Sequence, residues 1–417
     1  MRILFVSNFY PPYDRGGYEK HCHEIAVGLR DKGHAVHILT SRYGVAARVQ
    51  EDFVTRSLFL EADLEHYSPT DFLLHHRQKE QHNIQMLSET MASLRPDLIV
   101  FWGMWNLSRQ LPAWVEATSI PVAYWLEDLW PVEPDIHTRY WSLSTNHRVF
   151  QPIKSLVARI AHAILAAEHY PPRLQFQYPA CGSRFLKEKL SAAIPTFRDA
   201  EVVMCGIHLE PFEPYVAHTA LQVAEKPRLI YVGGLGAHKG VHTAIEAVAR
   251  LKARATALDP QLTIIGAGHP NYEAQLRDLE HTLGLSGKIH FQGALPQEAV
   301  PPILAENDIL IVPSIWEEPF GRVIVEGMAA GLVVVGTATG GSAEILVDNE
   351  NGLVFPPGDA EALAECLLRL IQDPALYARL AHAGKKTSEH FDITLMIDGM
   401  EKFLLKVIAC SGKDGIV

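Results

Sequence analysis

The alternation of apolar and polar positions at the start of the chain predicts a βαβ unit. The apolar run Ile3–Ser7 has the length and composition of a strand, and a Pro/Gly loop after it ends in Gly16-Gly17. Apolar residues then recur at the i, i+3, i+4, i+7 spacing of an amphipathic helix, at Cys22, Ile25, Ala26 and Leu29. Gly33 ends that helix, and Val36–Thr40 is a second strand. Continuous apolar strands of this kind are typical of a parallel sheet that is buried on both faces.

The same alternation of strands and helices continues along the chain and restarts after residue 225. In the first part it predicts a long helix over Asp71–Leu94 and strands at Leu98–Phe101 and Val122–Trp125. In the second part it predicts strands at Arg228–Val232, Leu262–Gly266, Ile289–Gln292, Asp308–Pro313 and Leu332–Gly336, and helices at Val241–Lys252 and Asn271–Leu283. The residues after Asp359 are predicted to be helical, with helix starts at Asp359 and at Asp373-Pro374.

Two α/β domains with doubly wound parallel sheets are the fold class that this pattern predicts. A chain of 417 residues is also longer than a single core usually grows. We interpret Pro211–Lys226, with its prolines and few apolar runs, as the linker. The expected domains are residues 1–215 and 216–390, followed by a C-terminal helix over 391–417 that packs back towards the N-terminal domain.

The net charge and the cysteine content limit which partners and which cellular compartment are expected. The net charge is −11, with 21 Lys+Arg against 24 Asp+Glu before residue 216 and 16 against 24 after it, so nucleic acid is not an expected partner. The five cysteines are odd in number, scattered and without CxxC spacing, which favours a reduced compartment. The chain shows no export signal and no run of eighteen apolar residues. We therefore predict a cytoplasmic protein.

The candidate functional residues lie where predicted strands end and helices begin, because ligands bind outside the carboxyl ends of parallel strands. The segment Glu318–Glu326 follows the strand that ends at Pro313 and opens a helix. Two carboxylates can flank one pocket there, Gly321 permits close backbone approach, and the amides of the first helical turn suit a phosphate. The alternative is a helix start that carries acids because of the helix dipole.

Several motifs, in order along the chain, resemble the retaining glycosyltransferases of family 4, which have the GT-B fold. Glu318–Glu326 resembles the E-x₇-E signature of that family, and Gly233–Gly240 resembles its G-R-L-x-x-x-K-G loop. Gly340-Gly341 with Glu344 resembles a G-G-x-x-E segment, Gly16-Gly17 an N-terminal glycine pair, and Met204–Ile207 a P-N-G-V stretch. The resemblance implies two Rossmann-like domains, with the nucleotide-sugar donor bound in the C-terminal one.

The resemblance also implies roles for individual residues. Glu326 is expected to accept hydrogen bonds from the ribose hydroxyls, Glu318 to contact the hydroxyls of the transferred sugar, and Lys239 to bind the diphosphate. The expected catalytic residues are Lys239, Glu318 and Asp128. The expected donor-binding residues are Gly16, Gly17, Gly233, Gly234, Lys239, Glu318, Phe320, Gly321, Arg322 and Glu326. For Lys239 the alternative is a solvated loop lysine.

One position departs from the family pattern. Gly234 stands where the family has an arginine, which removes a bidentate phosphate partner that a lysine replaces only in part. Arg184, near a predicted strand end, is a candidate to compensate, and a surface arginine at a helix start is the equal alternative.

The N-terminal domain is expected to bind the acceptor. Six of the seven tryptophans lie between residues 102 and 141, and Trp102, Trp105 and Trp130 follow strand ends, where aromatic faces suit sugars and apolar aglycones. Core packing is the alternative for each. Glu127 and Asp128 resemble the family's H-D-x-W stretch, with Glu127 in the place of histidine. An acid there is suited to orienting or deprotonating an acceptor hydroxyl, or else serves as a helix cap.

No metal site is predicted. His75, His76 and His82 lie on one predicted helix but have no companion ligands at metal-binding spacing, so a histidine-rich surface helix is the expected interpretation. The resemblance also implies catalysis without a metal and without a cofactor other than the donor itself.

The predicted function is transfer of a hexose-type sugar from a nucleotide-diphosphate sugar to an acceptor hydroxyl, with retention of configuration. A nucleotide-sugar epimerase and a non-catalytic nucleotide-sugar-binding module are the alternatives, and Gly234 favours the second of these. A lipid acceptor would bring the protein to the cytoplasmic face of a membrane, whereas a small metabolite or glycan would not. The motifs leave the sugar, the base, the acceptor and the oligomeric state open.

Overall fold

The computed structural model describes residues 1–64, 66–144, 151–215 and 225–411, and the chain forms two compact units. One unit contains Met1–Gly182, Leu186–Val203 and Ile397–Val417, and the other contains Ser183–Phe185 and Met204–Met396. Most of the predicted linker Pro211–Lys226 lies outside the described residues, as do the last six residues of the predicted C-terminal segment.

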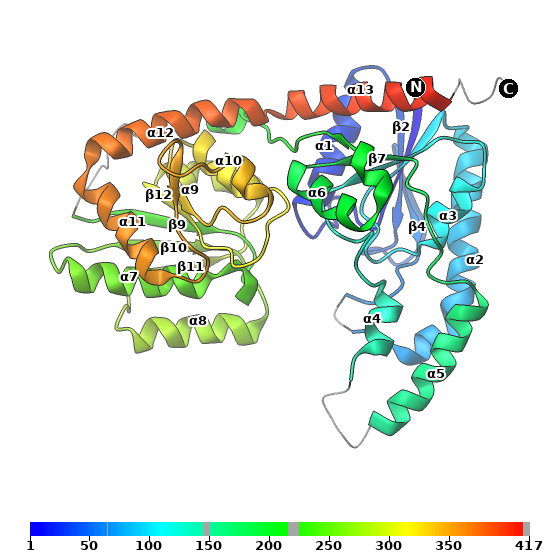
Figure 1. The fold of residues 1–417 in the computed structure, drawn as a ribbon, viewed down its shortest axis with the longest axis horizontal. Helices are drawn as coiled ribbons and strands as arrows, with labels where there is room; N and C mark the ends of the chain where they lie inside the picture. Colours follow the sequence, from blue (N-terminus) through cyan, green and yellow to red (C-terminus); the bar gives the residue numbers. More distant parts are fainter. Residues whose placement is uncertain (65, 145–150, 216–224, 412–417) are drawn as a thin grey trace. The chain divides into compact units, whose positions relative to one another are not determined.

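The first unit is built on an eight-stranded sheet in the order β3-β4-β2-β1-β5-β6-β7-β8 (Figure 1). Its strands are β1 (Arg2–Ser7), β2 (Ala35–Ser41), β3 (Val49–Glu51), β4 (Val54–Leu58), β5 (Leu98–Phe101), β6 (Val122–Leu126), β7 (Tyr178–Cys181) and β8 (Glu201–Val202). Every neighbouring pair is parallel except β3 and β4, which are antiparallel. β1, β5 and β6 are almost fully buried, as their continuous apolar sequences predict.

The helices of this unit are α1 (Gly17–Asp31), α2 (Pro69–Leu94), α3 (Gln110–Glu116), α4 (Ile136–Ser142) and α5 (Gln151–Ala167), together with most of α6 (Arg184–Ala193) and of α13 (Ile393–Ser411). The Ser68 side chain accepts a hydrogen bond from the N–H of Asp71, and Pro69 occupies the first turn, so α2 begins two residues before its predicted start. Figure 1 shows α4 and α5 beside the first half of α2, where they share one apolar cluster.

The second unit contains a six-stranded sheet in the order β11-β10-β9-β12-β13-β14, and all of its strand pairs are parallel. Its strands are β9 (Arg228–Val232), β10 (Gln261–Ile265), β11 (Ile289–Gly293), β12 (Ile309–Val312), β13 (Val333–Gly336) and β14 (Gly352–Val354). Its helices are α7 (Val241–Arg254), α8 (Pro270–Thr282), α9 (Val300–Ala305), α10 (Arg322–Ala329), α11 (Ala360–Gln372) and α12 (Pro374–Ser388). β9 lies next to β12, so the loops that follow these two strands lie at the same edge of the sheet.

The predicted fold class is confirmed: both sheets are parallel apart from one strand and are connected by helices. The side chains of Asp359 and Asp373 accept hydrogen bonds from the first turns of α11 and α12, so both predicted helix starts are also confirmed. All five cysteines lie in the described part of the chain, and none forms a disulfide. Within the described residues, no helix has the length and hydropathy needed to cross a bilayer.

The main segment of the second unit begins at Met204, whereas the predicted start of that domain is residue 216. Ile207 pairs with the segment just before α13: its N–H donates to Phe391, and its carbonyl accepts from the N–H of Ile393. This backbone pairing attaches the Met204–Ile207 stretch to residues that are far away in the sequence, which local sequence patterns do not reveal.

Candidate active site

The loop after β9 packs tightly against the end of β12. Gly240 adopts φ = 68°, and a Cβ atom there would lie 1.9 Å from the carbonyl oxygen of Pro313, so only glycine fits. The N–H of Ile315 donates to the carbonyl of His238 at 2.8 Å. These contacts fix the single turn Ala237–Lys239 and bring the Lys239 side chain to the loop that follows β12.

Lys239 and Glu318, two of the predicted site residues, are in direct contact. The Lys239 Nζ atom lies 2.7 Å from Glu318 Oε1 and 5.1 Å from the centre of the Trp316 ring. The hydroxyl of Ser314, a residue that the sequence did not suggest, donates to the same carboxylate oxygen. The Lys239 and Glu318 side chains keep 25% and 12% of their surface exposed, so an ammonium and a carboxylate face the same partly open site.

The glycine pair Gly340-Gly341 supports the backbone of this loop. The N–H of Gly341 donates to the Glu318 carbonyl at 2.6 Å. A Cβ atom would lie 2.5 Å from the Glu318 carbonyl oxygen if it were on Gly340 and 2.0 Å from the Pro319 carbonyl oxygen if it were on Gly341. The two glycines therefore let the two backbone segments approach more closely than any larger residue would permit. This contact fixes the position of the Glu318 loop relative to Gly340-Gly341.

The second predicted carboxylate, Glu326, lies one turn into α10. Its side chain accepts from Arg322 Nε at 3.1 Å, and both side chains are 14% exposed. Phe320 is 2% exposed, and its ring lies 5.7 Å from the ring of Phe391. Of the residues that open α10, Phe320 therefore offers a ligand its backbone rather than its side chain.

Gly234, the position that departs from the family pattern, has open space beside it. Its carbonyl accepts a hydrogen bond from the Tyr231 hydroxyl at 2.8 Å. A Cβ atom added there would meet nothing within 4 Å, whereas one on the neighbouring Gly233 would lie 2.9 Å from the Tyr231 hydroxyl. Local packing therefore leaves room for a larger side chain such as arginine at position 234. Glycine at this position removes a positive charge from the loop, and steric hindrance does not explain the substitution.

Glu344, in the G-G-x-x-E segment, binds backbone. Its two carboxylate oxygens accept from the N–H groups of Arg184 and Phe185, at 3.2 and 2.8 Å. The Ser183 hydroxyl donates to the Pro319 carbonyl at 2.7 Å. Segment Ser183–Phe185 is thereby tied to the Glu318 loop within the second unit, and a phosphate role for the Arg184 side chain stays a prediction.

In the first unit, the glycine pair at the start of α1 is anchored to the ends of two strands by the next residue. The Tyr18 hydroxyl lies 2.9 Å from the Trp102 carbonyl and 2.8 Å from the Trp125 carbonyl, at the ends of β5 and β6, so its single proton is shared between them. The Trp102 indole N–H donates back to the Tyr18 carbonyl at 2.9 Å. Gly16 and Gly17 therefore lie close to the carboxyl ends of β5 and β6.

Glu19 is a candidate that the sequence reasoning missed. It is 4% exposed in the first turn of α1, and burial raises its pKa to about 7, although the N–H groups of Glu19 and Arg15 oppose that shift. The carboxylate thus lies among the amides that open α1, next to the glycine pair that was expected to bind the donor. The sequence pattern that could have identified Glu19 is an acidic residue two positions after a glycine pair at the start of a helix.

The predicted acid pair lies after β6, and its two members differ. Glu127 Oε2 lies 2.9 Å from Nδ1 of the fully buried His21, a residue of α1. Burial, with the nearby charges of Glu133 and Glu127, raises the pKa of Asp128 to about 8, against a weak contact from the N–H of Trp130. A carboxyl group whose pKa is near neutrality is suited to proton transfer.

The three tryptophans that were predicted to contact the acceptor differ in how deeply they are buried. Trp102 is fully buried and stacks on Trp125 with ring centres 4.0 Å apart, and Trp130 is 1% exposed beneath Arg109. Trp105 is 40% exposed, and the centre of its ring lies 5.7 Å from the centre of the Phe9 ring. Trp102 and Trp130 therefore pack in the core, which was the alternative for them. Contact with the acceptor stays a prediction, for which Trp105 offers an exposed ring.

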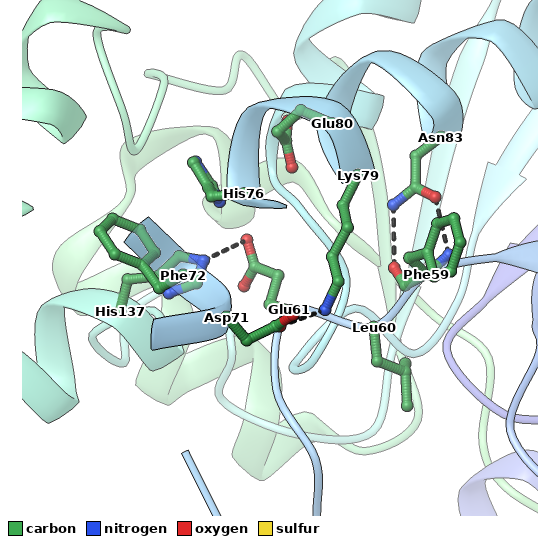
Figure 2. A pocket seen from close by; sticks show the side chains of 10 residues that line it. All are labelled: Phe59, Leu60, Glu61, Asp71, Phe72, His76, Lys79, Glu80, Asn83 and His137. Carbon is green, nitrogen blue, oxygen red and sulfur yellow. Dashed lines mark hydrogen bonds and ion pairs between the residues drawn. The ribbon is translucent and has the colours of Figure 1, made fainter. Parts of the chain in front are cut away.

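A separate polar pocket lies in the first unit between the loop after β4, α2 and α4 (Figure 2). The pocket is small and partly open to solvent, with about 10 Å³ available to the centre of a water molecule. Its lining residues are Phe59, Leu60, Glu61, Asp71, Phe72, His76, Lys79, Glu80, Asn83 and His137. Two of them, Asp71 and Lys79, form an ion pair, and Asn83 exchanges two hydrogen bonds with the backbone of Phe59.

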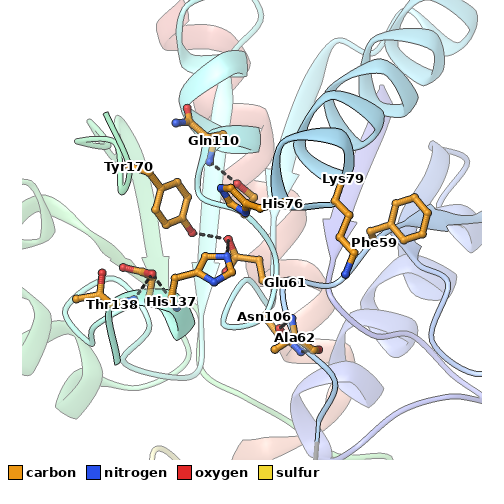
Figure 3. Close-up of polar contacts among 12 residues, drawn as sticks. Phe59, Glu61, Ala62, His76, Lys79, Asn106, Gln110, His137, Thr138 and Tyr170 are labelled. Carbon is orange, nitrogen blue, oxygen red and sulfur yellow. Dashed lines mark hydrogen bonds and ion pairs between the residues drawn. The ribbon is translucent and has the colours of Figure 1, made fainter. Parts of the chain in front are cut away.

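Glu61 is at the centre of this pocket. Its carboxyl accepts from the Tyr170 hydroxyl and lies 3.5 Å from Nε2 of the buried His137 (Figure 3). Burial, with the charge of Glu80, raises its pKa to about 8, and burial lowers the pKa of His137. The network connects the loop after β4 to α4 and to the segment after α5, and no motif in the sequence indicates it.

The prediction of a histidine-rich surface helix is wrong for His76. His75 is exposed beside Asp71, but His76 is 6% exposed, and its Nε2 lies 3.1 Å from Glu168. The buried stripe of α2 includes Phe72, His76 and Asn83, so polar residues occupy positions of the inward face. The apolar periodicity of the sequence does not reveal this face, because polar side chains occupy part of it.

Two family models match the chain. The model described as Glycosyltransferase Family 4 matches residues 15–170, and the model described as Glycosyl transferases group 1 matches residues 219–387. The two models cover the N-terminal and C-terminal motifs respectively.

Relatives of known name agree with these models. A lipopolysaccharide core biosynthesis glycosyltransferase, LpsE of Rhizobium meliloti, is 37% identical over 39% of this chain and 45% of its own length. The glycogen synthase of Mycobacterium tuberculosis is 26% identical over 93% of this chain and 90% of its own length.

Solved structures share the fold over nearly the whole chain. Sucrose-phosphate synthase from Thermosynechococcus elongatus has a TM-score of 0.72 and 20% identity, and covers 98% of this chain and 99% of its own. HepE from Anabaena, solved in complex with UDP and glucose, has a TM-score of 0.66 and 19% identity, and covers 97% of this chain and 99% of its own. With the two family models matched in order along the chain, the protein belongs to glycosyltransferase family 4, the group 1 glycosyl transferases, and transfers a sugar from a nucleotide-sugar donor.

Proposed function

We propose that the donor diphosphate binds in the second unit against Lys239 and the amides that open α10. The observation that carries this proposal is the 2.7 Å contact between Lys239 Nζ and Glu318 Oε1 at a partly exposed site beside the end of β12. An ammonium group that is shared between a carboxylate and a phosphate stabilises the charge that develops on the leaving oxygen. Lys239 then takes the role that a divalent ion has in other transferases, so no metal is required.

Glu318 and Glu326 are proposed to recognise the two sugars of the donor. Glu318 accepts from the hydroxyls of the transferred hexose, and Ser314 fixes the orientation of its carboxylate. Glu326 accepts from the ribose hydroxyls, and Arg322 holds that carboxylate in one rotamer. The same ligand receives close backbone contacts from Gly233, Gly234, Phe320 and Gly321.

The proposed reaction retains the anomeric configuration. The bond between the anomeric carbon and the diphosphate oxygen breaks, the bond to the acceptor oxygen forms on the same face, and the hydroxyl proton moves to the departing phosphate oxygen. No protein nucleophile is needed for this sequence of bonds. A UDP-hexose is the proposed donor, supported by the HepE complex with UDP and glucose.

The acceptor hydroxyl is proposed to bind in the first unit, near the carboxyl ends of β5 and β6. Trp105 offers an exposed ring, Asp128 a carboxyl of raised pKa, and Glu127 a carboxylate oriented by His21. The Gly16-Gly17 pair, which the family resemblance assigned to donor binding, supplies amides at the start of α1. The five cysteines without a disulfide support the cytoplasm as the compartment.

The decisive experiment measures donor turnover by wild type and by Lys239→Ala, with Lys252→Ala, near the far end of α7, as the matched control. UDP-glucose hydrolysis should fall about a hundredfold in Lys239→Ala and stay unchanged in the control, since one preorganised charge contact is worth roughly that factor. Equal rates in all three proteins would favour the non-catalytic binding module. Conversion of UDP-N-acetylglucosamine to its epimer without an acceptor would favour the epimerase.

A further inference from the structure

Trp316 leaves a large part of its indole ring in solvent. All seven tryptophans lie in the described part of the chain, and Trp316 and Trp105 are the two exposed ones, at 44% and 40%. Trp316 lies in the loop after β12, two residues before the largely buried Glu318. A single exposed apolar side chain is ordinary on a protein surface, so the way in which this ring is held decides what it means.

Two neighbouring loops hold the backbone of Trp316 in place. Its carbonyl accepts a hydrogen bond from the Thr339 hydroxyl at 2.8 Å, and its N–H donates to the carbonyl of His238 at 3.4 Å. Thr339 follows β13 and His238 follows β9, and both strands pair in parallel with β12. The three loops therefore leave the same edge of the sheet. The ring is exposed on a loop that is fixed from both sides.

Two side chains of the loop after β9 position the ring itself. The Lys239 Nζ atom lies 5.1 Å from the centre of the Trp316 ring, within the range of a cation–π contact. The centre of the His238 ring lies 5.3 Å from that of Trp316, with 78° between the two planes, which is an edge-to-face contact. The same Lys239 ammonium lies 2.7 Å from Glu318 Oε1. One cation thus contacts both an aromatic ring and a carboxylate, so the ring and the carboxylate border one site.

We infer that Trp316 is the stacking surface for the transferred sugar, whose C–H groups pack against the indole ring. A pyranose carries hydroxyls around its rim and C–H groups on its faces, so its binding site needs hydrogen-bonding groups beside an apolar surface. Glu318 supplies the first and Trp316 the second, because the negative face of an aromatic ring attracts the weakly positive hydrogens of C–H groups. The ring adjoins the ammonium that is proposed to bind the diphosphate. The sugar is bonded directly to that diphosphate, whereas the ribose separates the base from it.

This role of Trp316 rests on the proposed donor site, so its test compares two ligands that would share that site. Isothermal titration calorimetry gives the affinities of the full chain for UDP and for UDP-glucose, and the ratio of the two reports contact with the sugar. In Trp316→Ala the affinity for UDP-glucose relative to that for UDP should fall about fivefold, in line with the loss of one aromatic contact. A disturbance of Lys239 would act on the diphosphate, which both ligands carry, so it cancels in the ratio.

Two further variants and a spectroscopic signal sharpen this test. Trp316→Phe keeps an aromatic face and should restore most of the wild-type ratio. The matched control is Val347→Ala, a 39% exposed apolar residue between β13 and β14, which should leave the ratio unchanged. UDP-glucose should move the tryptophan emission of the wild type to shorter wavelengths more than UDP does, because the sugar covers an exposed indole. This difference between the two ligands should be absent in Trp316→Phe.

An unchanged affinity ratio in Trp316→Ala would overturn the inference. If that variant bound both ligands more weakly by the same factor, the ring would contact the nucleotide or hold Lys239 and would not contact the sugar. In either case the proposed donor site would stand, because the wild type would still bind UDP. Failure of the wild type to bind both UDP and UDP-glucose would instead contradict the proposed donor, and the role of Trp316 would fall with it.

Discussion

Lys239 Nζ lies 2.7 Å from Glu318 Oε1, although the two residues are separated by 79 positions in the sequence. The first follows β9 and the second follows β12, and these strands are neighbours in the parallel sheet. Their contact arises because both loops leave the same edge of that sheet, and Gly240 lets one loop approach the other closely. The Lys239 ammonium and the Glu318 carboxylate therefore form an ion pair, and a substitution of either residue changes the surroundings of the other.

Removing the charge of Glu318 should impair transfer more than donor binding. In Glu318→Gln the Lys239 ammonium loses its carboxylate partner, and the sugar loses a charged acceptor for its hydroxyls. We expect kcat/KM for the donor to fall about a hundredfold, the cost of one preorganised charged contact. Steady-state kinetics with UDP-glucose measures it, with Glu350→Gln, on an exposed turn, as the control. A loss of less than about threefold would contradict the proposed role, because such a loss is well below the effect of one preorganised contact.

Gly234→Arg should strengthen donor binding. A Cβ atom at this position has no neighbour within 4 Å, and a guanidinium can bind a phosphate through two parallel hydrogen bonds. A gain of about tenfold in affinity for UDP is expected, in line with one charged hydrogen bond. Isothermal titration calorimetry measures the change, and Gly234→Gln, which adds bulk without charge, is the control. If both variants bound UDP equally, the gain would not come from the charge.

Glu326→Ala should weaken nucleotide binding at least about tenfold, because a carboxylate that accepts from two ribose hydroxyls would be lost. The substitution also frees Arg322, whose Nε donates to Glu326 at 3.1 Å. Arg322→Gln therefore serves as a companion that removes this partner and keeps the carboxylate. Calorimetry with UDP and with uracil should show a loss for UDP alone. An unchanged affinity of Glu326→Ala for UDP would refute the ribose assignment.

The buried carboxyl of Glu61 makes stability depend on pH. Its pKa is raised to about 8 in the folded chain, against 4.5 for an ordinary glutamate, so the folded state binds more protons between these values. The free energy of unfolding should therefore fall as the pH rises from 4.5 to about 8, by at most about 1.4 kcal/mol per pH unit from this group. Below pH 4.5 and above about pH 8, the contribution of Glu61 to the free energy of unfolding does not change with pH.

Glu61→Gln removes that titration and should stabilise the protein relative to wild type progressively as the pH rises through this window. Urea unfolding at both ends of the window measures the difference. The control is Glu89→Gln, which lies on the same helix as His76 and whose side chain is 46% exposed. A difference between Glu61→Gln and wild type that is constant with pH, or that shrinks as the pH rises, would show that Glu61 is ionised in the folded state.

The sequence by itself determined most of the strands, the helix starts at Asp359 and Asp373, and the order of the motifs. It did not predict β3, β4, β8 or β14. β1, β9 and β12 are apolar runs in the interior of their sheets, and the capping aspartates Asp359 and Asp373 act on amides two or three residues away. Such features depend on neighbours along the chain, so periodicity and spacing reveal them. Glu318 and Glu326 were predictable for the same reason, because their spacing within a loop and one helical turn is local.

Only the tertiary structure decided which polar and aromatic side chains are buried. Trp102 and Trp105 are three residues apart in similar sequence surroundings, yet one stacks on Trp125 and the other faces solvent. His76 is buried on the inward face of α2, where it contacts Glu168, which directly follows α5. Burial of this kind depends on segments that are far apart in the chain, so no pattern along one helix or strand predicts it.

The tertiary structure also decided which charged residues meet. Spacing along the chain gives no reason for Lys239 to approach the Glu318 carboxylate, and the parallel pairing of β9 with β12 supplies that reason. The raised pKa values of Glu61 and Asp128 have the same origin, because desolvation is the main cause of both shifts. The free energy of desolvation arises only after distant segments have packed together and removed water from these carboxyl groups.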